Sequence, residues 1–187
     1  MLDIKEALTY DDVLLVPQYS DIKSRKEISI SNSLSKDILL NLPIISAPMD
    51  TVTSHEMAIA MSTMGGLGII HRYNSIAIQE KEVERAFDQG VTFVGAAVGV
   101  TEDFETRSCA LFDVGVRVIC IDVAHGHHTL VERAIKTLKD TFGDRVHIMA
   151  GNIATPEGYK ALSDWGADSI RCNVGGGSIC STRIQTG

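Results

Sequence analysis

The sequence predicts an α/β fold of parallel strands and crossover helices, arranged as a (β/α)8 barrel of the TIM type. Six short apolar runs lie at residues 43–49, 67–71, 93–98, 117–122, 146–150 and 169–174. Amphipathic segments separate these runs, and this alternation indicates a parallel sheet with crossover helices. Polar or glycine residues follow the runs, at the carboxyl ends where a barrel collects its active site. The competing fold, an open doubly wound sheet, is disfavoured because no G-x-G-x-x-G motif follows the first run.

Two segments precede the first strand. Residues 7–17 predict an extended arm, and the polar, alternating residues 19–41 predict a small hairpin or loop that covers one end of the fold. The expected helices occupy residues 54–64, 76–89, 103–114, 130–142 and 156–165. Ser54 and Thr155 are the expected N-caps of the first and last of these helices, because their hydroxyl groups can accept from otherwise unpaired backbone N–H groups.

The predicted barrel is incomplete. Six strands are two fewer than the eight that a closed barrel requires, and a complete barrel typically needs about 250 residues. The chain has 187 residues. We therefore expect a single catalytic barrel domain over residues 1–187 that lacks its C-terminal part.

Composition excludes several classes of protein. The net charge of −7 without any basic block disfavours binding to nucleic acid. No apolar run approaches the roughly 18 residues that span a membrane, and the N-terminus lacks the apolar core of a secretory signal. The four cysteines form no C-x-x-C pair. Reduced thiols in a cytoplasmic protein are therefore expected.

The glycine-rich stretch at residues 171–183 is the strongest candidate for a functional site. Three consecutive glycines allow positive φ angles and bring backbone N–H groups close to an anion, and the hydroxyl of Ser178 adds a further donor. A phosphate group suits such donors. Cys180 follows directly, so the stretch predicts a thiol nucleophile beside a phosphorylated substrate. The alternative is a flexible loop with an incidental cysteine.

Other candidate residues have simpler interpretations. Cys120 and Cys172 fall inside apolar runs and are expected to be small core residues. Asp122 ends a strand at the expected active edge, where a binding role is favoured over capping. The three methionines of residues 57–64 have helical spacing and predict a buried stripe. The histidines of residues 125–128 lack partners at metal-ligand spacing, so a polar loop is favoured over a metal site.

Seven short motifs are spread over the whole chain. They are LTYDDVLLVP at residues 8–17, SAPMDTVT at 46–53, GGLGIIHR at 65–72, VGAAVG at 94–99, DVAHG at 122–126, AGN at 150–152 and GSICSTR at 177–183. In content and order they resemble the IMP dehydrogenase / GMP reductase family. This resemblance implies a purine mononucleotide as substrate.

The resemblance assigns roles within the glycine-rich stretch. Cys180 would be the nucleophile that attacks C2 of the purine, and Thr182 would be the catalytic-loop threonine beside the thioimidate. Ser178 and the amide of Gly177 would bind the 5′-phosphate. The carbonyl groups of Gly175, Gly177 and Cys180 would hold a monovalent metal ion, usually K⁺.

The resemblance also assigns roles at other strand ends. Ser46 and Met49 match positions that line the nucleotide pocket. Asp122 and Asn152 match positions near the nicotinamide ribose and the reacting purine. Val123 lies beside them, on the cofactor side.

Two reactions are compatible with these motifs. We favour oxidation of IMP by NAD⁺ and water to XMP and NADH, a step of guanine nucleotide biosynthesis. The reason is that residues 65–71 resemble the sequence of the dehydrogenases at this position. The alternative is a GMP reductase, which converts GMP and NADPH to IMP and ammonia. Val123 replaces the Ser or Thr usual in dehydrogenases. Residues 74–92 also run through without the CBS domain pair that dehydrogenases usually insert there.

The sequence leaves two alternatives open, namely whether the cation site is present and whether the chain is catalytic. Asn173 is at a position where the family usually has glycine. A side chain at this position counts against the predicted cation site. A chain that ends at Gly187 is also compatible with a non-catalytic nucleotide-binding remnant or with a folding fragment of a barrel. For an active member of the family we expect a cytoplasmic homotetramer.

Overall fold

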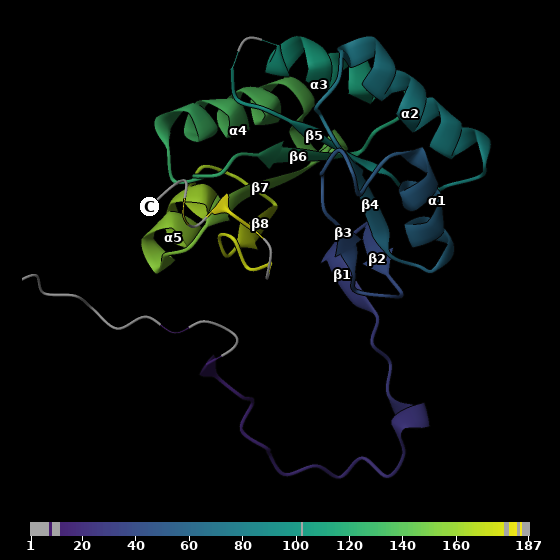
Figure 1. The fold of residues 1–187 in the computed structure, drawn as a ribbon, viewed down its shortest axis with the longest axis vertical. Helices are drawn as coiled ribbons and strands as arrows, with labels where there is room; N and C mark the ends of the chain where they lie inside the picture. The colour runs from purple at the N-terminus through teal and green to yellow at the C-terminus, as the bar shows by residue number, and fades with distance from the viewer. Residues whose placement is uncertain (1–7, 9–11, 102, 178–179, 183, 185–187) are drawn as a thin grey trace, which may run out of the picture.

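A curved sheet of six parallel strands forms the centre of the computed structural model, which describes residues 8, 12–101, 103–177, 180–182 and 184. Helices surround the outside of the curve (Figure 1). The strands are β3 (Ile45–Ser46), β4 (Leu67–Ile70), β5 (Gly95–Val98), β6 (Val118–Asp122), β7 (His147–Ile153) and β8 (Ser169–Cys172). Between them lie α1 (His55–Thr63), α2 (Ile76–Asp88), α3 (Phe104–Asp113), α4 (Thr129–Phe142), the 3-10 turn η3 (Gly143–Arg145) and α5 (Pro156–Asp164).

The strand order in space follows the strand order in the chain. The sheet runs β3-β4-β5-β6-β7-β8, and each neighbouring pair is parallel. A helix connects each strand to the next, which is the repeating unit of a barrel. The fold is therefore an incomplete (β/α)8 barrel, as the spacing of apolar runs predicted. The carboxyl ends of all six strands lie along one edge of the sheet, called the rim below.

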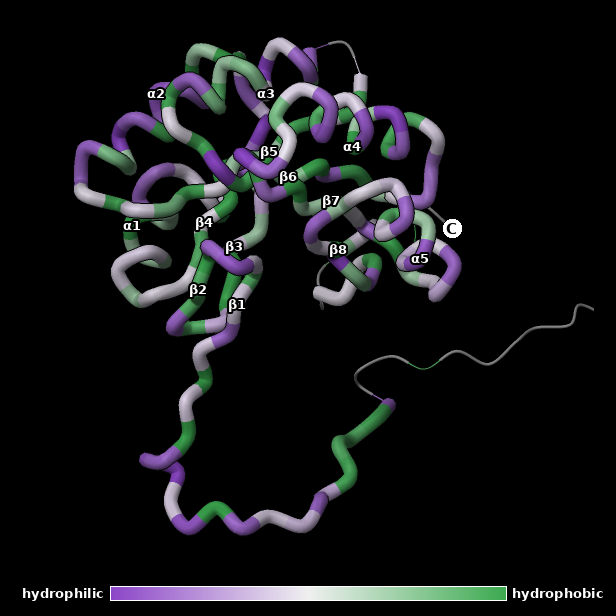
Figure 2. The backbone as a smooth tube through the Cα atoms, turned by 180° about the vertical axis from the view of Figure 1, so that it is seen from behind, coloured by the Kyte–Doolittle hydropathy of each residue, from purple (hydrophilic) through white to green (hydrophobic). Residues whose placement is uncertain are grey.

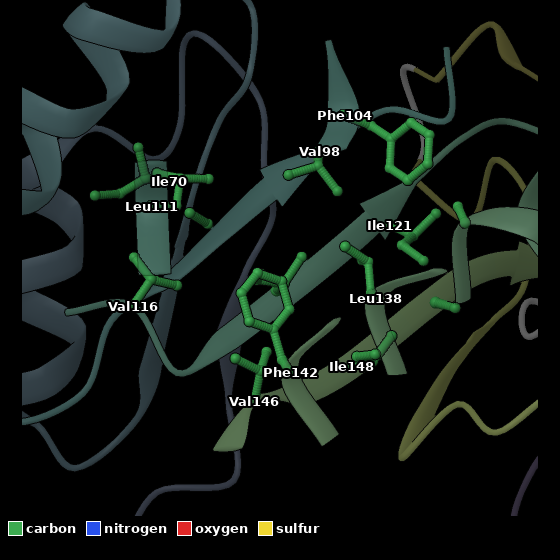
Figure 3. Close-up of a cluster of buried hydrophobic side chains, with 14 of the residues drawn as sticks. Ile70, Val98, Phe104, Leu111, Val116, Ile121, Leu138, Phe142, Val146 and Ile148 are labelled. Carbon is green, nitrogen blue, oxygen red and sulfur yellow. The ribbon is translucent and has the colours of Figure 1, made fainter. Parts of the chain in front are cut away.

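The main hydrophobic core lies between the sheet and the helices. Alternate side chains of the strands, such as Ile119 and Ile121 of β6, point outward and are fully buried. They pack with helix residues that include Leu111, Leu138 and Phe142 (Figure 3). Because parallel strands covered on their outer face must be apolar there, the continuous apolar runs of the sequence follow directly.

A second, smaller cluster fills the concave side of the sheet. The hairpin of β1 (Asn32–Ser35) and β2 (Ile38–Leu40) is antiparallel and covers the end of the barrel opposite the rim. Its side chains Ile38 and Leu40 are buried against inward-facing strand residues, among them Val118. The predicted hairpin over residues 19–41 is confirmed, in the shorter range that the strands occupy.

The arm before the hairpin extends away from the barrel (Figure 1). Apart from the 3-10 conformation at Asp12 and the short 3-10 turn η2 (Arg25–Glu27), its described residues have no regular structure. Figure 2 shows a hydrophobic stretch within the arm, where Leu14 and Leu15 are 95% and 97% exposed. The prediction of an extended arm is confirmed for residues 13–17, whereas Asp12 is in 3-10 conformation, and the earlier part of the arm lies outside the described residues except for Leu8.

Several local predictions need correction. The first strand is only two residues long, because Pro43 and Pro48 lack the N–H group that a ladder needs. Ser54 is the N-cap of α1 but makes no capping bond, and its hydroxyl donates instead to the Glu56 carboxylate. Thr155 behaves as predicted, since its hydroxyl accepts from the N–H of Gly158 at 3.1 Å.

The predicted methionine stripe and one predicted core cysteine are wrong. Met57 and Met64 of the α1 region are 37% and 68% exposed, and Ala58 is the buried residue of that helix. Cys172 is exposed at the end of the edge strand β8, whereas Cys120 in the middle of the sheet is fully buried. Helical spacing and apolar runs indicate which residues share a face, but not whether a neighbour covers that face.

Candidate functional site

The rim brings together the residues that the sequence singled out. Ser46 ends β3, Asp122 ends β6, and Asn152 lies near the end of β7. The glycine-rich loop leaves β8 directly after Cys172. Because all these strands are parallel, their carboxyl ends meet on one side of the barrel, as the sequence predicted.

The corner after β3 places Ser46 and Met49. Ser46 is 9% exposed, and its hydroxyl lies 2.9 Å from that of Thr53, which donates to the carbonyl of Ala47 at 2.7 Å. The Met49 carbonyl accepts from the N–H of Thr53 at 3.0 Å, so a tight turn leads from β3 into α1. Met49 is 51% exposed on this turn. Its apolar side chain is thus presented at the rim, where a planar base could pack against it.

Asp122 forms an ion pair with Arg171 of β8 across the concave face of the sheet. Nη1 of Arg171 also lies 3.7 Å from Sγ of Cys120. Burial alone would lower the pKa of Arg171, but its contacts with Cys120 and Asp122 outweigh burial and raise the pKa. Burial raises the pKa of the Cys120 thiol to about 12, so this thiol stays neutral. The Asp122 carboxylate is therefore the charge that stabilises the guanidinium.

Arg72 adds a second guanidinium to the rim. It follows β4 and reaches past the end of β5, so that Nη2 donates to the carbonyl of Asp122 at 3.3 Å. A Cβ atom on Gly99 would lie 3.4 Å from Nη1 of Arg72, so glycine leaves room for this side chain. The guanidinium carbon lies 5.3 Å from the centre of the Tyr73 ring. With Arg171, two cations here face one carboxylate, a balance that favours an anionic ligand.

Asn152 connects β7 to its neighbours at the rim. Its N–H donates to the carbonyl of Val123 at 2.9 Å, and its carbonyl accepts from the N–H of Gly126 at 2.6 Å. Its side-chain Nδ2 donates to the carbonyl of Asn173 at 3.1 Å. The peptide bond between Gly151 and Asn152 is cis. Oδ1 of Asn152 is buried without a partner among the described residues, so it can accept a hydrogen bond from a ligand.

The loop after β8 carries the predicted nucleophile. Sγ of Cys180 donates to Oγ1 of Thr182 at 3.1 Å, and the N–H of Cys180 donates to the carbonyl of Gly177 at 3.0 Å. Both side chains are half-buried. Gly175 has a φ of 63°, in the region that favours glycine. Ser178, the predicted phosphate ligand, lies outside the described residues.

A cavity of about 230 Å³ opens on the concave side between the first and last strands of the sheet. Ser46 and Pro48 line it from β3 and the turn that follows, and Arg171 lines it from β8. Met149 and Ile69 form part of its apolar wall. A space with an apolar wall and a few polar groups suits a small organic ligand.

One group of potential metal ligands lies on the helices instead of the rim. The ligand atoms of His55, Glu56 and Glu82 lie within 4.8 Å of one another. Glu82 accepts from the backbone N–H of His55 at 3.0 Å and lies 2.6 Å from its Nδ1. Burial opposes ionisation of Glu82, but the hydrogen bonds from His55 outweigh burial and lower its pKa. The group is best explained as a structural contact in which hydrogen bonds between His55 and Glu82 connect α1 to α2.

The histidines after β6 serve the local structure. Nδ1 of His128 accepts from the N–H of Leu130 at 3.1 Å and caps α4. The His127 ring lies 5.9 Å from the ring of Trp165, which packs against the main core. Their positions agree with the predicted polar loop.

Sequence reasoning missed two residues of the site, Arg72 and Arg171. Arg72 stands within a motif that carried the family resemblance, and Arg171 opens the glycine-rich stretch, but neither received a role. An arginine inside an otherwise apolar strand is a signal that could have identified Arg171. Its partner Asp122 lies 49 residues earlier, so no local pattern could have revealed the pair.

Comparisons with known proteins agree on one family. Residues 7–187 match the sequence model of the IMP dehydrogenase / GMP reductase domain. The inosine-5′-monophosphate dehydrogenase of Cryptosporidium parvum is 36% identical over 227 residues, which cover 99% of this chain and 56% of the relative. That of Borreliella burgdorferi is 34% identical over 232 residues, covering 98% and 57%. That of Nitrosopumilus maritimus is 28% identical over 309 residues, covering 100% and 65%.

The chain thus spans between 56% and 65% of the length of these three relatives. Among the described residues, no helix has the length and apolar character needed to cross a membrane.

Proposed function

The chain belongs to the IMP dehydrogenase / GMP reductase family, and from this we propose that it carries the nucleotide site of an enzyme that oxidises IMP to XMP. The observation that carries the proposal is the position of Cys180. Its thiol lies 3.1 Å from the hydroxyl of Thr182, on a glycine-rich loop at the barrel rim. Barrels place their catalytic groups on such loops.

Cys180 acts as the nucleophile in this proposal. Its thiolate forms a bond to C2 of the hypoxanthine ring, and the hydrogen at C2 leaves with its electron pair as hydride. The resulting thioimidate is cleaved by water, which adds its oxygen to C2 and returns a proton to the thiolate. Thr182 is close enough to Sγ to orient the thiol and the attacking water.

The glycine-rich loop binds the 5′-phosphate of the nucleotide. Backbone N–H groups near Gly177 and the hydroxyl of Ser178 supply the donors. Ser46 lines the purine pocket from the side of the cavity opposite Arg171, and Met49 presents its exposed side chain to the purine from the turn that follows. The two guanidinium groups of the rim, on Arg72 and Arg171, add positive potential that favours a phosphorylated substrate.

The hydride acceptor is NAD⁺, held near Asp122, Val123 and Asn152. The residues fit such a group, because Oδ1 of Asn152 is buried and needs a donor, which a ribose hydroxyl or a carboxamide supplies. Arg171 contacts Oδ1 of Asp122, and no side chain in the described part of the chain binds Oδ2, which leaves Oδ2 for a ligand hydroxyl. When bound, the nicotinamide supplies a site that accepts hydride.

A monovalent cation, K⁺, is proposed at the carbonyl groups of Gly175, Gly177 and Cys180. Backbone carbonyl oxygens are suitable ligands for this ion. The Gly177 carbonyl accepts one hydrogen bond, from the N–H of Cys180, and keeps a second lone pair for a cation. A cytoplasmic homotetramer remains our proposal for the assembly and location.

Nicotinamide absorbance at 340 nm, a general property of the reduced cofactor, tests the reaction. We expect the complete protein, with a closed barrel, to form NADH from IMP and NAD⁺. Chromatography should identify XMP as the second product. Oxidation of NADPH in the presence of GMP, without any reduction of NAD⁺ on IMP, would show that the chain is a reductase. Val123 favours the reductase reaction, since its side chain provides no hydroxyl to the cofactor.

A matched variant separates the reaction from background oxidation. Cys109 is exposed on α3, away from the loop, and Cys109→Ser should retain full turnover. Cys180→Ser should have none. If both variants retained turnover, a contaminating enzyme would explain the activity and the proposed function would be rejected.

A further inference from the structure

Asn173 connects the start of the glycine-rich loop to the end of β7 through hydrogen bonds. Its φ angle is 97°, in the left-handed region that residues other than Gly, Asn and Asp rarely adopt. Its N–H donates to the carbonyl of Ile153 at 2.7 Å. Its carbonyl accepts from Nδ2 of Asn152 at 3.1 Å. Both main-chain groups of Asn173 are therefore bound to β7.

The side chain of Asn173 folds back onto the loop itself. Oδ1 accepts from the N–H of Val174 at 2.7 Å. Nδ2 lies so close to Gly176 that a Cβ atom there would approach it to 2.7 Å. The amide thus occupies the space that a side chain at position 176 would need, and its hydrogen bond to Val174 holds the turn.

This turn sets the direction in which the chain leaves the sheet. A glycine at position 173 could adopt the same φ angle, but it would also populate other conformations. The engaged amide of Asn173 removes that freedom. The thiol of Cys180 follows seven residues later, after the Gly177–Cys180 hydrogen bond of 3.0 Å. Its position relative to the barrel therefore depends on the turn.

We infer that Asn173 is a positioning residue, which fixes the turn at the start of the loop and so sets the place of the Cys180 thiol at the rim. In this role it acts through Asn152, Val174 and Gly176 and touches no ligand. The inference rests on the proposed role of Cys180 as nucleophile, whereas the geometry of the turn does not depend on it.

Two substitutions in the full chain separate the contributions of Asn173. Asn173→Gly keeps the positive φ angle and removes the amide. Asn173→Asp keeps the Oδ1 acceptor for the N–H of Val174. Asn32→Ala is the matched control, because Asn32 is exposed in β1 at the opposite end of the barrel.

Two measurements apply to each variant. The first is kcat and KM with IMP and NAD⁺. The second is the pH profile of Cys180 alkylation by iodoacetamide, read by mass spectrometry, with the exposed Cys109 as internal reference.

We expect Asn173→Gly to lower kcat between about tenfold and hundredfold, as misplacement of a reacting group by about 1 Å does. The midpoint of the Cys180 alkylation profile should move, while labelling of Cys109 and the melting temperature stay the same. Asn173→Asp should restore most of kcat, and Asn32→Ala should match the unaltered chain.

Two results would overturn the inference. One is an unchanged kcat and Cys180 profile in Asn173→Gly. The other is an equal loss in both Asn173 variants together with a lower melting temperature, which would make Asn173 a residue of the fold only. If the unaltered chain neither turns over IMP nor is protected by it from alkylation, the proposed function fails. The Cys180 profiles still decide the positioning role in that case.

Discussion

The two faces of the sheet differ in what their side chains do. On the convex face, Ile119 and Ile121 of β6 are buried against helices in an apolar core. On the concave face of the same strand, the side chains change from Val118 through Cys120 to Asp122 as the rim approaches. Successive residues of a strand point to opposite faces, so one short segment stabilises the fold on one side and supplies polar groups on the other. Substitutions on the two faces should therefore affect different properties.

The largest effect is expected at the rim. Cys180→Ala should lower kcat by about 10³-fold or more, because the group that forms the covalent bond is lost. The melting temperature should stay unchanged, since the half-buried thiol lies outside the apolar core. Steady-state kinetics and circular dichroism together measure both quantities. Appreciable turnover by Cys180→Ala would contradict the proposal that the rim serves catalysis while the convex face serves stability.

A substitution on the convex side should show the opposite pattern. Leu138 of α4 is 1% exposed, and Leu138→Ala should lower the free energy of unfolding by about 2–5 kcal/mol through lost burial and a residual cavity. The kcat of the folded fraction should be unchanged. Leu130→Ala is the control on the same helix, because Leu130 is 37% exposed. Urea titration followed by circular dichroism gives the comparison, and equal destabilisation by both variants would contradict it.

The ion pair of the concave face should contribute to both stability and function. Asp122→Asn leaves the Arg171 guanidinium without its carboxylate, and a lost charged hydrogen bond costs about 1.5–3 kcal/mol of unfolding free energy. KM for the nicotinamide cofactor should also rise. Asp140→Asn, an exposed change on α4, should alter neither. A double-mutant cycle with Arg171→Gln measures the coupling, and a coupling energy near zero would show that the pair contributes nothing.

The smallest effect is a pH dependence from His147 at the start of β7. Burial lowers its pKa, and Nε2 lies 2.8 Å from Oγ of Ser169. Because the unfolded chain then binds more protons than the folded one, stability is complete above the unfolded pKa of about 6.5. It should fall by up to about 1.4 kcal/mol per pH unit as the pH drops from there to the folded pKa.

Urea titrations between about pH 7.5 and about pH 5.5, one unit on either side of the ordinary histidine pKa, measure this slope. Substitution His147→Gln should flatten it, and the exposed His125→Gln should not. A slope that persists in His147→Gln would assign the pH dependence to other groups.

Much of the fold was predictable from the sequence because its signals are local. Apolar strands, helical spacing and the cap at Thr155 depend on neighbouring residues, and each was found close to its predicted position. The rim was predictable for the same reason, since parallel strands necessarily bring their carboxyl ends together. The family resemblance likewise depended on short contiguous motifs, and the comparisons confirmed it.

The tertiary structure alone decided which faces are covered and which polar groups meet. The exposed Cys172 and Met64 contradicted predictions made from local pattern, because burial depends on what packs against a residue. The partners in the pairs Asp122–Arg171 and Asn152–Asn173 are 49 and 21 residues apart in the chain. Hydrogen bonds and ion pairs act over a few ångströms in space, and sequence separation carries no information about that distance until the chain is folded.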